Sequence, residues 1–406
     1  METATQRKLL ENMIVLELTE SQAGATCTQT LAWMGAEVIK IEPPGSGEPG
    51  RQQGKPAGKA ADSVFFFLHN TSKKSVTLNL RHRFGQELFA QLVAKADVVV
   101  NNLQQGNFER LGWSYERLQQ CNPAIIYATI SGFGSEGPYS EFPYTDTIAQ
   151  ALGGGVCTTG YPDRPPTMPR NYAGESGAGL HTALAILAAY ADRLDTGRSH
   201  QVEVSMQDAV VNLVRTKMWP YYNTGQPFVR RGNRLATVPG GIYPCKPGGP
   251  NDYVYVYVHY NIPTMWDGCL RAMDRADLIG DERFADSGTR LEHREEIEQM
   301  FTAWTMSKTK YEVLEALGRE GVPCGATLDT SDMLTNEHLK ARDMMVEIDH
   351  PEYGPMTLPG CPIKVTDGPI TFTSAPLLGA DNAAVYGTLL GLDRQRLQEL
   401  QAQGII

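Results

Sequence analysis

The chain has 406 residues, of which 41% are hydrophobic and 20% charged, and its formal net charge at pH 7 is −10. This length can bury a large core in two or three domains, and the composition is that of an ordinary soluble globular protein. The excess of acidic residues argues against a nucleic-acid partner, because basic residues occur only in short pairs such as Lys73-Lys74.

The first half of the chain predicts strands that alternate with helices. Runs of β-forming residues predict strands at 13–19, 37–43, 74–80, 97–103 and 124–133. A helix is expected at 83–96, and a long helix from Gly179 onward. The segment 200–214 predicts a further strand that leads into a helix. This order is that of βαβ units, so we expect a doubly wound α/β domain with a parallel sheet.

The composition changes near residue 220, where a segment rich in Gly, Pro and Arg (221–252) predicts irregular structure. A strand is then expected at 253–260, with helices at 264–273 and 294–307. Mixed structure follows residue 328, and a polar helix is expected at 393–404. The second half of the chain therefore contains a smaller domain of its own.

Cysteine usage and hydropathy favour the cytoplasm. The seven cysteines are scattered without a CxxC pair, as expected of reduced thiols rather than of a disulfide framework or a zinc site. The first residues lack the apolar core of a signal peptide, and the longest run of small and apolar residues, 178–191, is too short to span a bilayer. We expect a cytoplasmic protein that uses neither a metal nor a redox cofactor.

Glu175 is the only acid in a stretch of small residues, 173–179, at the start of the long helix. Small side chains let a backbone or a ligand approach closely. One interpretation is a helix-start charge that the helix dipole stabilises by about 0.3–1 kcal/mol. The other is a nucleophile, since a carboxylate can attack an activated carbonyl and form an acyl-enzyme anhydride. Such an anhydride survives only where water is excluded.

Polar and basic residues lie next to several predicted strands. The loop 22–29, "QAGATCTQ", opens a helix whose free N–H groups can hold an anion, although it is not a GxGxxG motif and a plain βα turn is the alternative. Lys73 and Lys74 precede one strand, and Asn102 and Arg110 follow another. Each basic residue alone fits a solvated surface charge. Together they predict a phosphate-rich ligand at the carboxyl edge of the sheet.

In sequence the chain resembles the class III CoA-transferases (the CaiB/BaiF family), most closely the formyl-CoA transferase branch. The resemblance covers nearly the whole chain, from about residue 12 to the C-terminus, and its segments occur in the same order. It is carried by "QAGATCTQTLAWMGAEVIKIEPPGSGEPGR", "NTSKKSVTLNL", "FERLGWSYERLQQCNPAIIYATISGFG", "TDTIAQALGG", "GESGAGLHTALAILAAY", "TGRSHQVEVSMQDAVVNLV", "GVPCGATL" and "TSAPLLGAD".

The resemblance implies covalent catalysis. In the family a carboxylate attacks the thioester of an acyl-CoA donor, and an enzyme–CoA thioester passes CoA to an acceptor acid. The family's residue is Asp, and its place falls on Glu175 here. Glu would move the carboxylate by roughly 1 Å, a shift that can cost on the order of 10²-fold in rate unless the pocket is adjusted. Either the pocket is built around Glu, or the position has drifted in a non-transferring relative.

The resemblance also implies contacts with coenzyme A. The family's CoA-binding positions fall on Gln22, Ala23, Leu78, Asn102, Leu103, Arg110, Leu111 and Met206. Lys73 and Lys74 are added as phosphate partners because of their charge. The acyl-binding features of the oxalate-using enzymes are not kept: their tryptophan falls on Gln53, and their lysine and tyrosine fall on Pro143 and Thr145. We therefore do not expect transfer between formyl-CoA and oxalate.

The fold that the resemblance implies is a Rossmann-like large domain, 1–218 completed by 325–406, plus a smaller α+β domain, 219–324, in an interlocked homodimer. The expected reaction moves CoA from an acyl-CoA donor, succinyl-CoA, to a small organic acid through a glutamyl anhydride and a glutamyl-CoA thioester. Arg170, Arg230 and Arg231 could anchor a second anionic group on that acid, or could be plain surface arginines.

Two other functions stay open. An acyl-CoA racemase of the same superfamily would need a base near the α-carbon of the acyl group. The racemases place a histidine in the loop after "ISGFG", where this chain reads "SEGPYSEFPY" and has none. The other alternative is a non-catalytic CoA-binding partner subunit.

Overall fold

The computed structural model describes residues 7–55 and 62–406, which fold into two compact units. Unit 1 comprises the chain up to Thr158, Met168–Phe228 and Leu339–Ile406, and unit 2 comprises Thr159–Thr167 and Val229–His338. Relative to the predicted boundary at 325, unit 2 extends further, because Cys324–Ala326 (β9) pairs with Tyr253–Tyr257 (β8) inside it.

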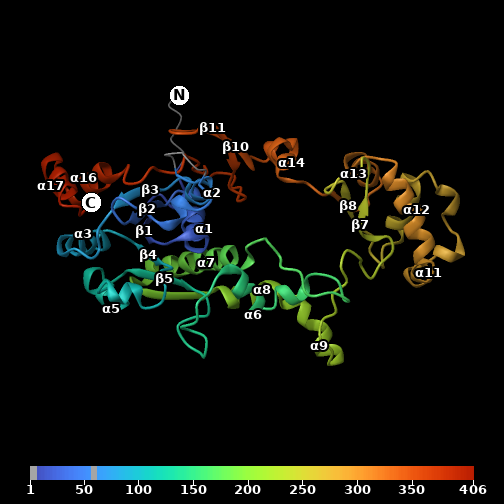
Figure 1. The fold of residues 1–406 in the computed structure, drawn as a ribbon, viewed down its shortest axis with the longest axis horizontal. Coiled ribbons are helices and arrows are strands. Elements are labelled where there is room, and N and C mark those ends of the chain that lie inside the picture. Colours follow the sequence, from blue (N-terminus) through green and yellow to red (C-terminus); the bar gives the residue numbers. More distant parts are fainter. Residues whose placement is uncertain (1–6, 56–61) are drawn as a thin grey trace. The chain divides into compact units, whose positions relative to one another are not determined.

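A six-stranded parallel sheet forms the centre of unit 1, in the order β3-β2-β1-β4-β5-β6 (Figure 1). Each strand lies within the segment predicted for it, and the α/β prediction is confirmed. The strands are β1 (Ile14–Leu18), β2 (Glu37–Glu42), β3 (Lys74–Thr77), β4 (Val98–Asn101), β5 (Ile126–Ser131) and β6 (His200–Ser205).

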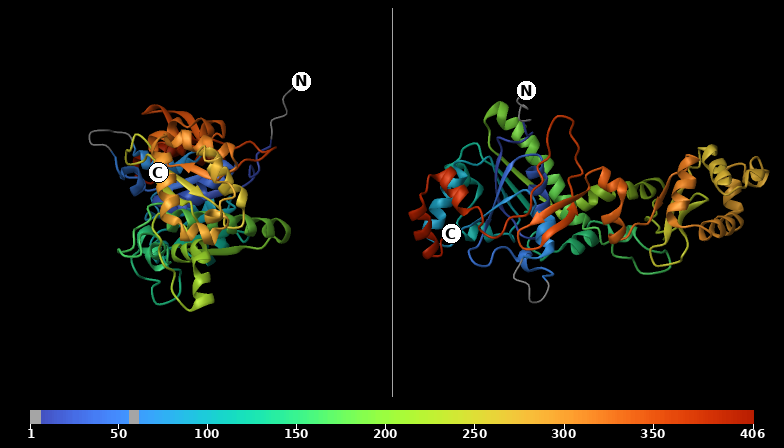
Figure 2. Two further views of the ribbon diagram at one scale, coloured as in Figure 1. Left: turned by 90° about the vertical axis from the view of Figure 1, so that its right-hand side faces the viewer. Right: turned by 90° about the horizontal axis from the view of Figure 1, so that it is seen from above.

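Helices cover both faces of this sheet, which is why its central strands are apolar on both sides (Figure 2). Successive side chains of a strand point to opposite faces, so Val15 joins one core and Leu16 the other. The face of Val15 is covered by α1 (Ser21–Trp33), α7 (Ala173–Thr196) and α8 (Met206–Val214). The face of Leu16 is covered by α3 (Arg83–Val93), α5 (Tyr115–Cys121), α16 (Asn382–Leu390) and α17 (Arg394–Ala402).

The C-terminal segment covers the edge strand β3, which would otherwise expose unpaired backbone groups. The Ser75 N–H donates to Asp381 Oδ2 and the Thr77 N–H donates to Asn382 Oδ1, each at 2.8 Å. The Tyr386 hydroxyl donates to the Thr77 carbonyl at 2.8 Å. The remaining elements of unit 1 are α2 (Val64–Asn70), α4 (Asn107–Arg110), α6 (Asp146–Leu152), α9 (Trp219–Thr224), β10 (Met345–His350) and β11 (Gly354–Pro359).

Unit 2 is built on an antiparallel sheet of three strands in the order β7-β8-β9, with β7 at Gly240–Pro244. Its core contains Trp266, Phe284 and Phe301, packed between this sheet and the helices. The helices are α10 (Pro263–Ala272), α11 (Ser287–Glu292), α12 (Arg294–Met306), α13 (Lys310–Arg319) and α14 (Thr330–Thr335), while α15 (Glu337–Ala341) spans the junction to unit 1.

A buried group of charges lies beneath the first βα loop. The Glu17 carboxylate, wholly buried on β1, accepts from Lys40 Nζ at 2.9 Å and lies 3.0 Å from Lys73 Nζ. Burial by itself would raise the pKa of Glu17, but the charges of Lys40 and Lys73 lower it to about 2. Burial lowers the pKa of Lys73 to about 8. These charges therefore depend on one another, since none of the three is exposed.

Glu17→Gln removes the negative charge that the buried ammonium groups of Lys40 and Lys73 share. We expect the free energy of unfolding to fall by about 3–5 kcal/mol, the cost of breaking a buried ion pair, as measured by urea unfolding at pH 7. Glu87→Gln is the matched control, because its ion pair with Arg83 is exposed and should contribute less than about 1 kcal/mol. Equal losses in the two variants would contradict the assigned importance of the buried group.

Candidate functional site

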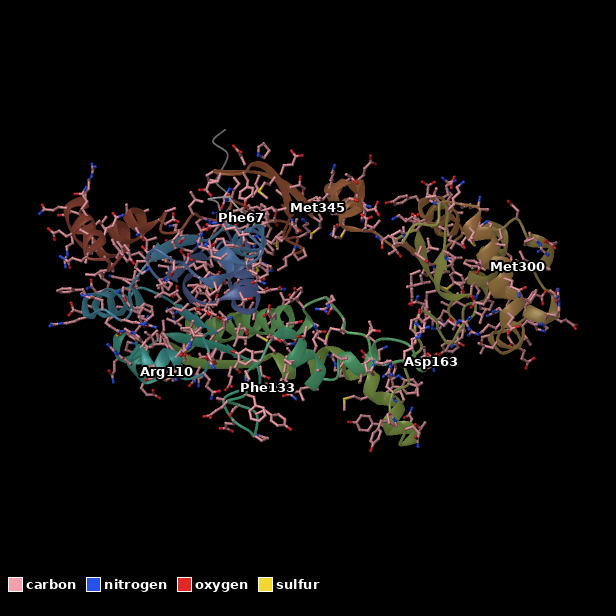
Figure 3. The ribbon with its side chains drawn as sticks, viewed as in Figure 1. Phe67, Arg110, Phe133, Asp163, Met300 and Met345 are labelled. Atoms are coloured by element: carbon pink, nitrogen blue, oxygen red, sulfur yellow. The ribbon has the colours of Figure 1, made fainter. Side chains whose placement is uncertain are left out.

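A cavity of about 930 Å³ lies at the carboxyl edge of the sheet, where the loops after β1, β4 and β5 meet the first turns of α7 and α8. Four residues singled out from the sequence share it: Asn102, Arg110, Glu175 and Met206. Arg110 ends α4, and Phe133 lies in the loop that follows β5 (Figure 3). The other lining residues are Glu20, Ser21, Gln104, Gln105, Gly106, Glu109, Ser140, Glu141, Phe142, Pro143, Tyr144 and Thr145.

Glu175 is half-buried in the first turn of α7, and its backbone is held by Asp146. One oxygen of the buried Asp146 carboxylate, Oδ1, accepts from the Gly174 N–H at 2.9 Å and from the Glu175 N–H at 3.1 Å. These are N–H groups that a helix start leaves without a partner in the helix. A side chain at residue 174 would crowd this contact, because a Cβ there would lie 3.0 Å from Asp146 Oδ1.

The charge state of Glu175 is set by the same surroundings. Burial raises its pKa, and the negative charge of Asp146 adds to the increase, which brings the pKa to about 7. A carboxylate with a raised pKa is more basic and therefore a better nucleophile when it is ionised, and near neutral pH a large fraction is ionised. Raised pKa values of this kind are characteristic of functional sites.

The small residues around Glu175 make room for protein neighbours. A Cβ on Gly179 would lie 2.5 Å from the Ala23 carbonyl oxygen, and one on Gly177 would lie 2.9 Å from Leu213. The glycines therefore allow α7 to pack closely on α1 and α8. Gln22, at the start of α1, donates from Nε2 to the Ser176 hydroxyl at 2.7 Å and ties the two helix starts together. Ala23 is buried in the same contact.

Asn102 joins two of the loops that line the cavity. Its side chain accepts from the Glu20 N–H at 2.7 Å and donates to the Glu20 carbonyl at 2.8 Å. Arg110 donates to Asn107 Oδ1. Five predicted contact residues do not line the cavity. Gln22 and Ala23 lie in the contact between α1 and α7 described above. Leu78 is buried in the core, Leu111 packs against that core, and the Leu103 N–H donates to Asn101 Oδ1.

Lys73 and Lys74 also lie away from the cavity. The Lys73 ammonium is buried, where it donates to Asn70 Oδ1 at 2.9 Å and pairs with Glu17. Lys74 begins β3 and pairs at 2.7 Å with Glu37, which begins β2, so this pair lies at the amino edge of the sheet. The structure therefore does not support the expected phosphate contacts, because both ammonium groups have carboxylate partners elsewhere.

Sequence reasoning missed three residues that contribute to the site. Glu20 directly follows the strand predicted at 13–19, and a polar residue at the end of a predicted strand is the signal that identified Asn102, so Glu20 could have been found. Asp146 follows Thr145, whose side chain accepts from the Ile148 N–H as an N-cap. A Thr-Asp pair ahead of an apolar run predicts a helix start. Nothing local, however, indicates that Asp146 contacts Gly174, and Tyr144 has no sequence signal of its own.

Residues 7–55 and 62–406 contain no group of three or more His, Cys, Asp or Glu side chains that could hold a metal ion. Within the same ranges, none of the helices combines the length and the hydropathy needed to cross a membrane.

Comparison with known proteins gives a consistent result. Residues 10–382 match the family described as CoA-transferase family III. A formyl-CoA:oxalate CoA-transferase of Streptomyces avermitilis is 38% identical over 413 residues, which cover 98% of this chain and all of the relative. One from Streptomyces coelicolor is 38% identical over 414 residues, covering 98% and 99%. A solved CaiB/BaiF family protein from Brucella suis superposes with a TM-score of 0.83 at 28% identity, covering 95% of this chain and 100% of that one.

The raised pKa of Glu175 makes a prediction for stability. Below about pH 4.5 the carboxyl is protonated in both the folded and the unfolded chain, and above about pH 7 the folded chain bears the cost of a half-buried charge. Stability is therefore lost as the pH rises through this window. We expect Glu175→Gln to be more stable than the original protein at pH 8, by roughly 1–3 kcal/mol after allowance for solvent screening, and equally stable at pH 4.5.

Urea unfolding at the two pH values measures this difference. Glu136→Gln, which removes an exposed carboxyl from the loop after β5, is the control for the loss of one negative charge. A Glu175→Gln variant that gains no stability at pH 8 relative to pH 4.5 would show that the site does not raise the pKa of this carboxyl.

Proposed function

The chain belongs to CoA-transferase family III and is a CoA-transferase, and from this premise we propose that Glu175 is the carboxylate through which CoA is exchanged. The observation that carries the proposal is the placement of Glu175. It is a half-buried carboxylate, with a raised pKa, in a cavity at the carboxyl edge of a parallel sheet, the edge where such sheets bind ligands. The resemblance seen in the sequence is confirmed at the level of the family.

The proposed reaction has two symmetrical halves. Glu175 attacks the carbonyl carbon of the donor thioester, the C–S bond breaks, and a mixed anhydride and CoA thiolate form. The thiolate then attacks the Glu175 carbonyl carbon, so that the donor acid leaves and a Glu175–CoA thioester remains. The acceptor carboxylate attacks this thioester and displaces the thiolate. The thiolate finally attacks the acceptor carbonyl of the new anhydride, which releases acyl-CoA and the free Glu175 carboxylate.

The structure supports this chemistry through positioning. Because Asp146 fixes the backbone N–H groups of Gly174 and Glu175, the carboxylate starts from a defined helix turn. Holding a reacting group in the right geometry can accelerate a reaction by several orders of magnitude. For CoA itself, we propose that it enters along the loops of Asn102 and Arg110, where the Arg110 guanidinium is the basic group that lines the cavity and suits a phosphate.

Succinyl-CoA is the donor that we propose, with a small organic acid as the acceptor. The two Streptomyces relatives are named for formyl-CoA and oxalate. In this chain, however, the family's oxalate-binding tryptophan, lysine and tyrosine are replaced by Gln53, Pro143 and Thr145. A panel of acids assayed with succinyl-CoA, acetyl-CoA and formyl-CoA distinguishes these choices. We place the enzyme in the cytoplasm, where thiols such as its seven free cysteines stay reduced.

If Glu175 is the nucleophile, exposure to an acyl-CoA donor should leave a Glu175–CoA thioester that hydroxylamine traps and mass spectrometry locates. Glu175→Ala should abolish transfer but still bind CoA in a calorimetric titration. Glu175→Asp shortens the side chain by one methylene and should lower the rate by about tenfold or more if the pocket is built for Glu.

Glu136→Ala, an exposed carboxyl outside the cavity, should retain full activity and form the same adduct. Full activity in Glu175→Ala would end the nucleophile assignment and return this residue to a helix-start charge. If the protein without substitutions binds CoA but never forms the adduct, it would instead be a non-catalytic CoA-binding subunit.

We also propose that the enzyme is a homodimer. Large apolar side chains on α7, α8 and α9 are more than half exposed in the single chain. These three helices lie near one another along the chain in unit 1. The exposed side chains are Leu184, Leu194, Leu213, Trp219, Tyr221 and Tyr222. Exposed apolar surface on this scale is typical of an interface.

Sedimentation velocity should find a dimer that persists at nanomolar concentration, since interlocked chains cannot separate without unfolding. Sedimentation in urea below the unfolding transition serves as the control, because an ordinary apolar interface would dissociate there before the chains unfold. A monomer at nanomolar concentration in buffer would disprove the interlocked arrangement.

A further inference from the structure

Tyr144 is a phenol in the same cavity as Glu175 whose hydroxyl has no hydrogen-bond partner among the residues that the structure describes. It stands two positions before Asp146, whose carboxylate holds the Glu175 N–H. Three consecutive residues therefore have distinct roles: Tyr144 lines the cavity, Thr145 is the N-cap of α6, and Asp146 fixes the backbone of the proposed nucleophile. Any movement of the start of α6 would shift the phenol and the nucleophile together.

The ring of Tyr144 is fixed by its neighbours. Gly132, directly after β5, lies so close that a Cβ there would be 2.2 Å from the ring's Cγ. The Phe133 ring meets it edge to face, with centroids 6.3 Å apart. The ring also packs against the core formed by α1, α7 and α8. The ring is thus held by protein neighbours in a residue that lines the cavity.

The electrostatic surroundings keep this phenol protonated. Burial raises its pKa, and the nearby carboxylates of Glu20 and Glu175 raise it further. A protonated phenol without a protein acceptor is a donor available to a ligand. A thioester that enters the cavity to meet Glu175 brings a carbonyl oxygen, and this oxygen gains negative charge when the carbonyl carbon is attacked.

Resting on the proposed function, we propose that Tyr144 donates a hydrogen bond to the acyl oxygen of the thioester as Glu175 attacks it. During the attack the Glu175 oxygen–carbon bond forms and the carbonyl π electrons move onto the acyl oxygen, where the Tyr144 O–H meets them. When the C–S bond breaks, the carbonyl re-forms and CoA leaves as the thiolate. Tyr144 keeps its proton throughout, so it acts as a catalytic hydrogen-bond donor and needs no further reactant.

The substitution Tyr144→Phe tests this role, because it keeps the ring that packs on Gly132 and removes only the hydroxyl. With excess succinyl-CoA, rapid quenching and mass spectrometry give the rate at which the Glu175–CoA thioester forms in a single turnover. We expect this rate to fall about 100-fold in Tyr144→Phe, the typical effect of removing one donor from a developing oxyanion. The affinity for CoA, measured by calorimetry, should be unchanged.

Tyr139→Phe is the matched control. Tyr139 belongs to the same loop, and its ring meets Phe133 edge to face and Phe142 at a tilt, but it does not line the cavity. It should form the thioester at the rate of the original protein. Adduct formation in Tyr144→Phe within threefold of that rate would overturn the inference alone. An original protein that forms no adduct would overturn the proposed function, and the role of Tyr144 with it.

A fluorinated tyrosine at position 144 gives a readout that a merely structural role would not change. Its phenol ionises at lower pH and then cannot donate. The alkaline limb of the pH–rate profile for adduct formation should therefore move to lower pH in the fluorinated enzyme. A limb that stays in place would show that the hydroxyl does not act in the step.

Discussion

The contact between the Asp146 carboxylate and the first N–H groups of α7 is the constraint on which the site depends. It joins the starts of two successive α-helices, α6 and α7, fixes the backbone of Glu175, and contributes negative charge next to its side chain. One carboxylate thus serves both geometry and electrostatics. The second oxygen of Asp146 accepts from Gln150 Nε2 at 2.6 Å, which keeps the carboxylate in this orientation.

The buried charges of Glu17, Lys40 and Lys73 stabilise the start of α1, which contacts the start of α7. Lys40 contacts both Glu17 and Glu48, and Glu48 in turn accepts from the Ser21 N–H at 2.9 Å. Ser21 adopts a left-handed backbone conformation with φ of 59°, which is unfavourable for a residue with a side chain. The ion network therefore holds a strained turn at the start of α1, directly where Gln22 contacts the start of α7. Lys73 belongs to this network through its ion pair with Glu17.

The sequence was sufficient to predict the parallel sheet and the position of Glu175 at the start of a long helix, because both depend on local patterns. Runs such as 13–19 and 97–103 consist mainly of β-forming residues, and a residue that ends or follows such a run lies at the carboxyl edge of the sheet. The sequence could not show that the Lys73 ammonium pairs with Glu17 instead of a phosphate, because Glu17 is 56 positions away. The glycines of α7 could not be interpreted for the same reason. From the sequence they could make room for a backbone or for a ligand, and the neighbours that decide between the two lie on α1 and α8.

The return of the chain to unit 1 after unit 2 has a consequence for how the protein is made. Ser75 on β3 receives its partner Asp381 from a position 306 residues later, and Tyr386 reaches Thr77 across 309. A ribosome releases these partners only after it has released the 300 or so residues that separate them from β3. Until then the nascent chain carries a sheet with one uncovered edge, and such edges invite pairing with other chains. Residues around Asp381 and Tyr386, which are synthesised much later, therefore cover the open edge of the first sheet to form.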